Sequence, residues 1–137
     1  MSPKPVCIRI PDETRRAIAE TGRRTGRGFS AVANEMLTEA VRMRRIPGIV
    51  FADSPGGREA IVAGTGLGVF EVVAVYRAVA GSWERLGEAF DWLSEVQLRA
   101  ALAYAEAYPE EIEERLAGEA RWEPEETWRQ YPFTRPR

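Results

Sequence analysis

A short strand without a neighbouring partner, residues 6–10, is the feature that most constrains what this chain can fold into. Apolar residues alternate with others here, the period of a strand with one buried and one exposed face: Val6, Cys7, Ile8, Arg9 and Ile10. A lone strand would leave backbone hydrogen-bonding groups unpaired and its apolar face uncovered. We therefore expect it to pair with the same strand of a second copy.

Two helical patterns follow the strand. Asp12 is suited to cap the first, which runs to about Thr25, and the glycines of Gly26-Arg27-Gly28 break it. Ser30 is suited to cap the second, whose apolar residues recur every three or four positions: Val32, Ala33, Met36, Leu37, Ala40 and Val41. Residues 1–46 are thus predicted to form a strand-helix-helix module that dimerises through Val6, Ile8, Ile10, Met36 and Leu37. The first helix offers only Ile18 as a large apolar residue, which predicts a thin core.

Paired antiparallel about a two-fold axis, the two strands would direct Cys7 and Arg9 outward from the shared core. Such a ribbon fits the DNA major groove, where arginine can bind guanine through two hydrogen bonds. The charge distribution agrees, because residues 1–50 hold ten Lys and Arg against five Asp and Glu, whereas residues 51–137 hold nine against sixteen. A basic front half indicates a nucleic-acid partner, although charge scatter is the alternative.

Three stretches carry a family pattern: the run from Val6 to Glu13, Gly-Arg-Gly-Phe-Ser at 26–30, and Ala-Val-Ala-Asn-Glu-Met-Leu at 31–37. They resemble the ribbon-helix-helix repressors common among bacterial antitoxins. The resemblance covers about the first third of the chain and implies that outward strand residues contact bases while the start of the second helix contacts phosphate. The predicted DNA-binding residues are Lys4, Cys7, Arg9, Arg27, Phe29 and Ser30. Of these, Arg9 is the best suited to read sequence, and Cys7 is a poor reader of bases.

Residues 47–117 are predicted to form a second module. Two short apolar runs around a Pro-Gly-Gly turn, residues 49–52 and 59–63, indicate a hairpin. Gly64-Thr65-Gly66-Leu67-Gly68 lacks the ending and spacing of a phosphate-binding loop, so we interpret it as a strand-to-helix turn. Three helices follow, with Ser82 as a cap for the second and a Ser94–Gln97 capping box for the third. Pro109 marks either a break or a new helix start, and the glutamates at 110, 111, 113 and 114 are expected to be solvated.

This second module also resembles a family, on Val62-Ala63-Gly64-Thr65-Gly66-Leu67, the Val69–Val73 helix start, and the run from Trp92 to Tyr104. It is similar to a small helix-turn-helix-like domain, formerly of unknown function, in VapB-type antitoxins. That domain contacts DNA or serves dimerisation. Because the module here is acidic, we favour dimerisation and scaffolding over DNA contact.

Residues 118–137 combine aromatic side chains with prolines. Such a segment cannot form a core of its own, and exposed tryptophans are favoured interface anchors. It either folds back onto this chain or, as we expect, docks on a partner protein. The family resemblance implies a PIN-type ribonuclease toxin, whose predicted contacts are Trp122, Trp128, Arg129, Tyr131, Phe133 and Arg135.

The single cysteine and the absence of histidine exclude an internal disulfide and the usual zinc and histidine-dependent catalytic sites. We expect no enzymatic activity, cofactor or metal, and a cytoplasmic location, because the chain has no apolar run suited to a membrane span or signal peptide. The predicted fold is mainly α with short β: a ribbon-helix-helix module, a β-hairpin with three helices, and an extended C-terminal tail. The predicted function is that of an antitoxin, a homodimer or higher even oligomer, which represses its own operon and neutralises the ribonuclease. The alternative is a free-standing regulator without a toxin.

Overall fold

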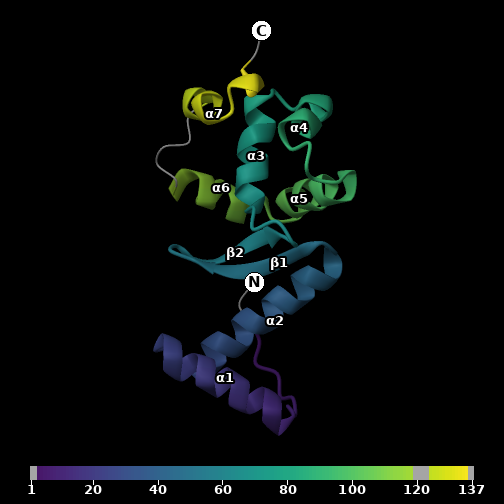
Figure 1. Ribbon diagram of the computed structural model, residues 1–137. Coiled ribbons are helices and arrows are strands. Elements are labelled where there is room, and N and C mark those ends of the chain that lie inside the picture. Colours follow the sequence, from purple (N-terminus) through teal and green to yellow (C-terminus); the bar gives the residue numbers. More distant parts are fainter. Residues whose placement is uncertain (1–2, 119–123, 136–137) are drawn as a thin grey trace. The chain divides into compact units, whose positions relative to one another are not determined.

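The computed structural model describes residues 3–118 and 124–135, and these are mainly helical with one two-stranded sheet (Figure 1). The chain divides into two compact units, Met1–Val41 and Arg42–Arg137, and each is described by itself. The elements in chain order are α1 (Asp12–Thr25), α2 (Phe29–Arg45), β1 (Ile49–Ser54), β2 (Gly57–Val62), α3 (Val69–Ala78), α4 (Trp83–Ala89), α5 (Glu95–Ala107), α6 (Pro109–Gly118), α7 (Pro124–Gln130) and the 3-10 helix η1 (Pro132–Thr134).

The first unit contains α1 and most of α2, and its helix starts differ from the prediction. Pro11, with ψ of 146°, is the residue at the N-cap of α1, so Asp12 lies in the first turn rather than at the cap. There its carboxylate binds Arg15 at 2.6 Å and Arg16 at 2.8 Å, and its charge complements the helix dipole. Helix α2 starts at Phe29, which places Ser30 inside the first turn, not at the cap.

The predicted hairpin in the second unit is confirmed. Strands β1 and β2 pair antiparallel from Ile49 opposite Val62 to Ser54 opposite Gly57. The segment after β2 is the predicted turn into α3: the Thr65 hydroxyl donates to the Val62 carbonyl at 2.7 Å and accepts from the Leu67 amide at 2.9 Å. Gly64 and Gly66 have φ of 79° and 69°, in the left-handed region that glycine adopts without steric cost.

The predicted caps of α4 and α5 are confirmed. Ser82 accepts a hydrogen bond from the Arg85 amide, and Ser94 and Gln97 form a reciprocal capping box at 3.2 and 2.8 Å. The prediction of three helices is corrected to four, because Pro109 is the first residue of α6. Proline is favoured there since a first-turn amide has no partner inside the helix.

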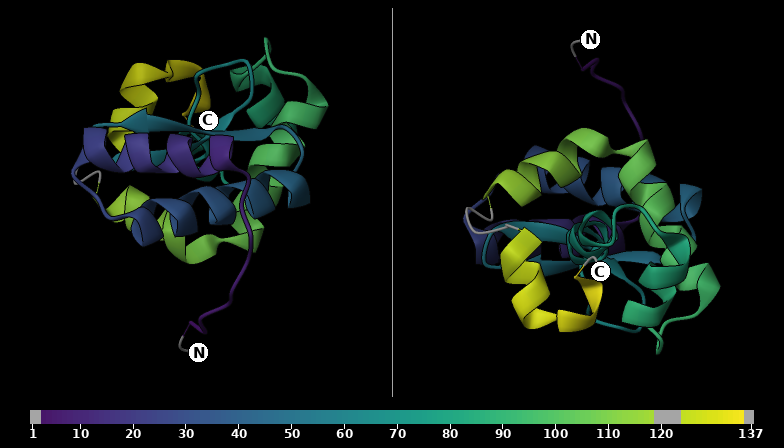
Figure 2. Two further views of the ribbon diagram at one scale, coloured as in Figure 1. Left: turned by 90° about the horizontal axis from the view of Figure 1, so that it is seen from below. Right: turned by 90° about the horizontal axis from the view of Figure 1, so that it is seen from above.

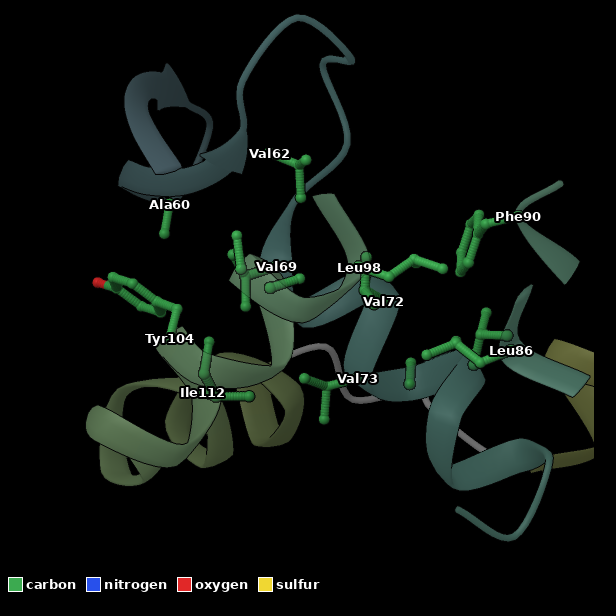
Figure 3. Packing of buried hydrophobic residues seen from close by; sticks show 14 of the residues in the cluster. Ala60, Val62, Val69, Val72, Val73, Leu86, Phe90, Leu98, Tyr104 and Ile112 are labelled. Carbon is green, nitrogen blue, oxygen red and sulfur yellow. The ribbon is translucent and has the colours of Figure 1, made fainter. Parts of the chain in front are cut away.

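Helix α3 occupies the centre of the second unit. Its side chains are buried around most of its circumference: Val69, Val72, Val73, Ala74, Val75 and Ala78. It contacts β2, α4, α5, α6 and α7, and in the right panel of Figure 2 it is seen end-on with other helices around it. Figure 3 shows the resulting core, in which Leu86, Leu98 and Ile112 come from α4, α5 and α6, and Phe90 comes from the end of α4. A helix that is apolar on all sides is stable only when covered on all sides.

The predicted extended tail is wrong for residues 124–134, where α7 and η1 pack within the second unit. The indole of Trp128 donates to the Ala78 carbonyl at the end of α3 at 3.3 Å, and the Tyr131 ring lies 6.4 Å from that of Phe90. Arg85 donates to the backbone carbonyls of Phe133 and Arg135. Folding back onto this chain, the alternative to partner docking, is therefore the arrangement found for these residues, because α3 supplies an apolar surface and an open carbonyl.

One polar cluster interrupts the core of the second unit. Arg42 donates to the Tyr104 hydroxyl at 2.9 Å and to Glu111 at 3.1 Å, and the Tyr104 hydroxyl donates to Glu111. The Arg42 guanidinium lies 4.1 Å from the centre of the Tyr108 ring. Glu111, one of the four α6 glutamates expected to be solvated, keeps a side chain that is 42% exposed and also accepts these two hydrogen bonds, because a partly buried arginine and the hydroxyl of a buried tyrosine require an acceptor. Glu113 also forms an ion pair, with Arg77.

Replacing Tyr104 with Phe removes the hydroxyl that joins Arg42 to Glu111. We expect the free energy of unfolding near neutral pH to fall by about 1–3 kcal/mol, because two partly buried polar groups lose a partner. Urea unfolding followed by circular dichroism measures this. Tyr108→Phe is the matched control, since it keeps the ring over which Arg42 lies.

The same variant has a defined pH signature. Burial, followed by the hydrogen bond to Glu111, raises the pKa of the Tyr104 hydroxyl, and Arg42 only partly opposes this. Because the folded pKa is the higher one, the stability this group contributes is present below the unfolded pKa of about 10 and is lost as the pH rises above it. Tyr104→Phe should therefore lose less stability than wild type between about pH 9 and about pH 11. Equal losses in the two proteins would contradict the assignment.

Candidate nucleic-acid interface

The segment predicted to form the DNA-binding ribbon precedes α1. In the single chain, residues 3–11 form no helix or strand, and Figure 2 draws them as an extended segment. Lys4, Cys7 and Arg9, the predicted base contacts, are all exposed. The predicted dimer residues are also uncovered, with Val6 82% and Ile8 59% exposed and Ile10 half-buried.

Helix α2 adds a second uncovered apolar surface in the same unit. Met36 and Leu37, predicted for the dimer interface, are 38% and 54% exposed. Phe29 and Val41 are exposed as well and were not assigned to the interface, although Val41 belongs to the same helical repeat as Leu37. Among the described residues of the first unit, only Ile18 and Val32 are buried large apolar side chains.

The turn between α1 and α2 sets the position at which α2 begins. The predicted phosphate-contacting residues lie at that position. Gly26 has φ of 69°, and the Arg27 amide donates to the Gly22 carbonyl at 2.9 Å, which together end α1 in a Schellman-type turn. A Cβ on Gly22 would lie 2.7 Å from the Arg27 carbonyl oxygen, so this buried position requires glycine. Sequence reasoning missed Gly22, because a glycine inside a helical pattern does not reveal what approaches it.

The cations near this turn are not equivalent. Arg27, one of the predicted phosphate contacts, binds Glu35 at 2.9 Å, which neutralises part of its charge. Arg23 and Arg24 lie exposed in the last turn of α1, and they have no ion pair with any described residue. Phe29 and Ser30 are exposed at the start of α2. In the described part of the unit, no hydrogen bond or ion pair joins these residues to Lys4, Cys7 or Arg9.

The predicted toxin-binding residues fall into two groups. Trp128 and Tyr131 are half-buried against the second unit, as described above, whereas Arg129, Phe133 and Arg135 are exposed. Trp122 lies outside the described residues. Trp128 and Tyr131 thus pack within the second unit, whereas Arg129, Phe133 and Arg135 remain accessible to a partner protein.

The chain shows no sign of a metal centre or of a membrane-spanning helix in the residues that the structure describes. The described residues contain no group of three or more His, Cys, Asp and Glu side chains that could hold a metal ion. None of the described helices is both long enough and apolar enough to cross a membrane. Comparison with protein-family models, curated proteins and solved structures finds no match to this chain.

Replacing Ile8 with Asp tests the expected self-pairing of the ribbon. We expect loss of the dimer, because each copy would place a carboxylate where an apolar side chain worth about 1.5–3 kcal/mol of burial is needed. Light scattering after size exclusion measures the mass. Cys7→Asp is the matched control, because it adds the same charge at an adjacent position expected to face outward. A dimer that survives Ile8→Asp would contradict the pairing.

Proposed function

We propose that the first unit forms a ribbon-helix-helix dimer that binds operator DNA. The observation that carries this proposal is the exposure of Val6 and Ile8 together with Met36 and Leu37 in a unit whose own core is Ile18 and Val32. So small a core does not stabilise a domain alone, and a second copy would cover both apolar surfaces. The exposed Arg9 would then enter the major groove, with Arg23 and Arg24 available for phosphate contact.

We further propose that the whole chain is an antitoxin that represses its own operon and neutralises a PIN-like ribonuclease in the cytoplasm. Support comes from the resemblance of both modules to antitoxin domains and from the exposed Phe133, flanked in sequence by the exposed Arg129 and Arg135. An aromatic anchor among cations suits a partner whose active site carries metal-binding carboxylates. The chain itself would carry no catalysis and require no cofactor.

The second candidate is a free-standing ribbon-helix-helix regulator without a toxin. It is favoured by the packing of Trp128 and Tyr131 on the second unit, because these side chains already have a partner within the chain. The two candidates share the DNA-binding step and differ only in the protein partner.

Replacing Arg9 with Ala tests the DNA-binding step. We expect weaker binding to the DNA upstream of the chain's own gene and a loss of about 1–3 kcal/mol of discrimination against unrelated DNA, because a base contact is removed. Fluorescence anisotropy with both DNAs at matched salt measures this. Arg16→Ala is the control, since Arg16 binds Asp12 on α1. An unchanged ratio of the two affinities would overturn the role of Arg9.

The neighbouring reading frame separates the antitoxin from the free-standing regulator. We expect it to encode a small ribonuclease whose RNA cleavage stops when this chain is added in equal amount. A fluorogenic RNA assay with purified proteins measures this. A neighbouring protein that neither binds this chain nor loses activity would favour the regulator.

A further inference from the structure

The corner between α4 and α5 exposes apolar side chains that the folded chain does not use. Trp92 is 59% and Val96 73% exposed, within five residues of each other, while Leu93 between them is buried. We call the surface formed by Glu88, Asp91, Trp92, Glu95 and Val96 the α4–α5 corner. A tryptophan placed mostly in solvent is a common anchor of protein interfaces.

The corner is supported by ring and arginine contacts on neighbouring residues. The Phe90 ring, 2% exposed, meets the Trp92 ring edge-on at 6.3 Å between centroids. At the start of α5, Arg99 lies 4.7 Å from the centre of the Trp83 ring and binds Glu95 at 2.7 Å. The Trp92 ring thus already has a packing partner in the folded chain, and a side chain that is ordered before binding loses less entropy on binding.

The charge around the corner is negative. Glu88 and Asp91 are exposed and form no ion pair with any described residue. Of the two nearby arginines, Arg99 binds Glu95, so these two charges offset each other, whereas Arg85 donates to the uncharged carbonyls of Phe133 and Arg135 and keeps its charge. Glu88 and Asp91 together still leave the corner net negative. An acidic rim around an apolar centre disfavours nucleic acid, whose phosphates it would repel, although α4 and α5 have the order of a helix-turn-helix.

A second copy of the chain is an equally poor occupant. A two-fold interface places the same patch of both copies face to face, so two surfaces of the same negative charge would lie against each other. A partner protein that presents cations around an apolar pocket fits the corner better. Its cations would pair with the acidic side chains, and its pocket would bury Trp92 and Val96.

We infer that the α4–α5 corner is a docking surface for a protein with a basic, apolar-centred contact face, and that this partner is the ribonuclease, bound on its RNA-binding surface. This inference rests on the proposed antitoxin function. Acidic and aromatic groups on the corner would occupy the positions of RNA phosphates and bases, so docking would block substrate access. The corner also connects to the tail through Phe90, whose ring is 6.3 Å from Trp92 and 6.4 Å from Tyr131.

The test is the affinity of the full-length chain for the purified ribonuclease encoded beside it. We expect the double variant Trp92→Ser/Val96→Ser to weaken binding by at least about 30-fold, as loss of an interface anchor does. Val50→Ser removes an exposed valine from β1 instead, and should change affinity by less than about fivefold. Thermal unfolding of each variant confirms that the fold is kept.

Charge reversal tests the chemistry of the partner. Glu88→Arg/Asp91→Arg should slow association and flatten its dependence on salt, while Glu106→Arg, an exposed change elsewhere on α5, should do neither. A wild-type chain that fails to bind overturns both this inference and the antitoxin proposal. Wild-type affinity in Trp92→Ser/Val96→Ser overturns the corner alone, as does a fall in the chain's own oligomeric mass in that variant, which would assign the corner to a second copy.

Discussion

The burial of α3 on nearly all sides is the constraint on which the rest of the second unit depends. With valines or alanines at six of its buried positions, this helix cannot leave a face in water at low cost. The hairpin, α4, α5 and α6 each cover part of it, and α7 covers the end at Ala78. Residues 124–134 are helical and packed for this reason, although aromatic residues interrupted by prolines do not show the helical period in the sequence.

Local signals in the sequence predicted much of the second unit. The hairpin, the turn at Thr65 and the caps at Ser82 and Ser94 depend on hydrogen bonds between residues that are close together in the sequence. A short stretch of sequence is therefore enough to predict them. The misses are of another kind. Tyr104 and Glu111 accept hydrogen bonds from Arg42, which is more than sixty residues away in the sequence, and Trp128 donates to a carbonyl fifty residues away. No local spacing of residues predicts such contacts.

The candidate DNA-binding site divides in the same way. Arg9 and the alternating apolar residues around it could be assigned from the period of the strand alone. The pairing of Arg27 with Glu35 across the turn could not, because it depends on the approach of Gly22 to the backbone of Arg27. That ion pair reduces the contribution to DNA binding that we expect of Arg27. Arg9, Arg23 and Arg24 are therefore the more important candidates for DNA contact.

The packing of α7 and η1 links the integrity of the tail to that of the whole second unit. A protease that removed residues 124–135 would uncover the carbonyl of Ala78 and the aromatic face of Phe90, and would release Arg85 from two backbone carbonyls. Tail loss is therefore a destabilising event and not a neutral trimming. A clipped chain would be more open to further digestion, so its lifetime in the cell would depend on whether residues 124–135 stay in place.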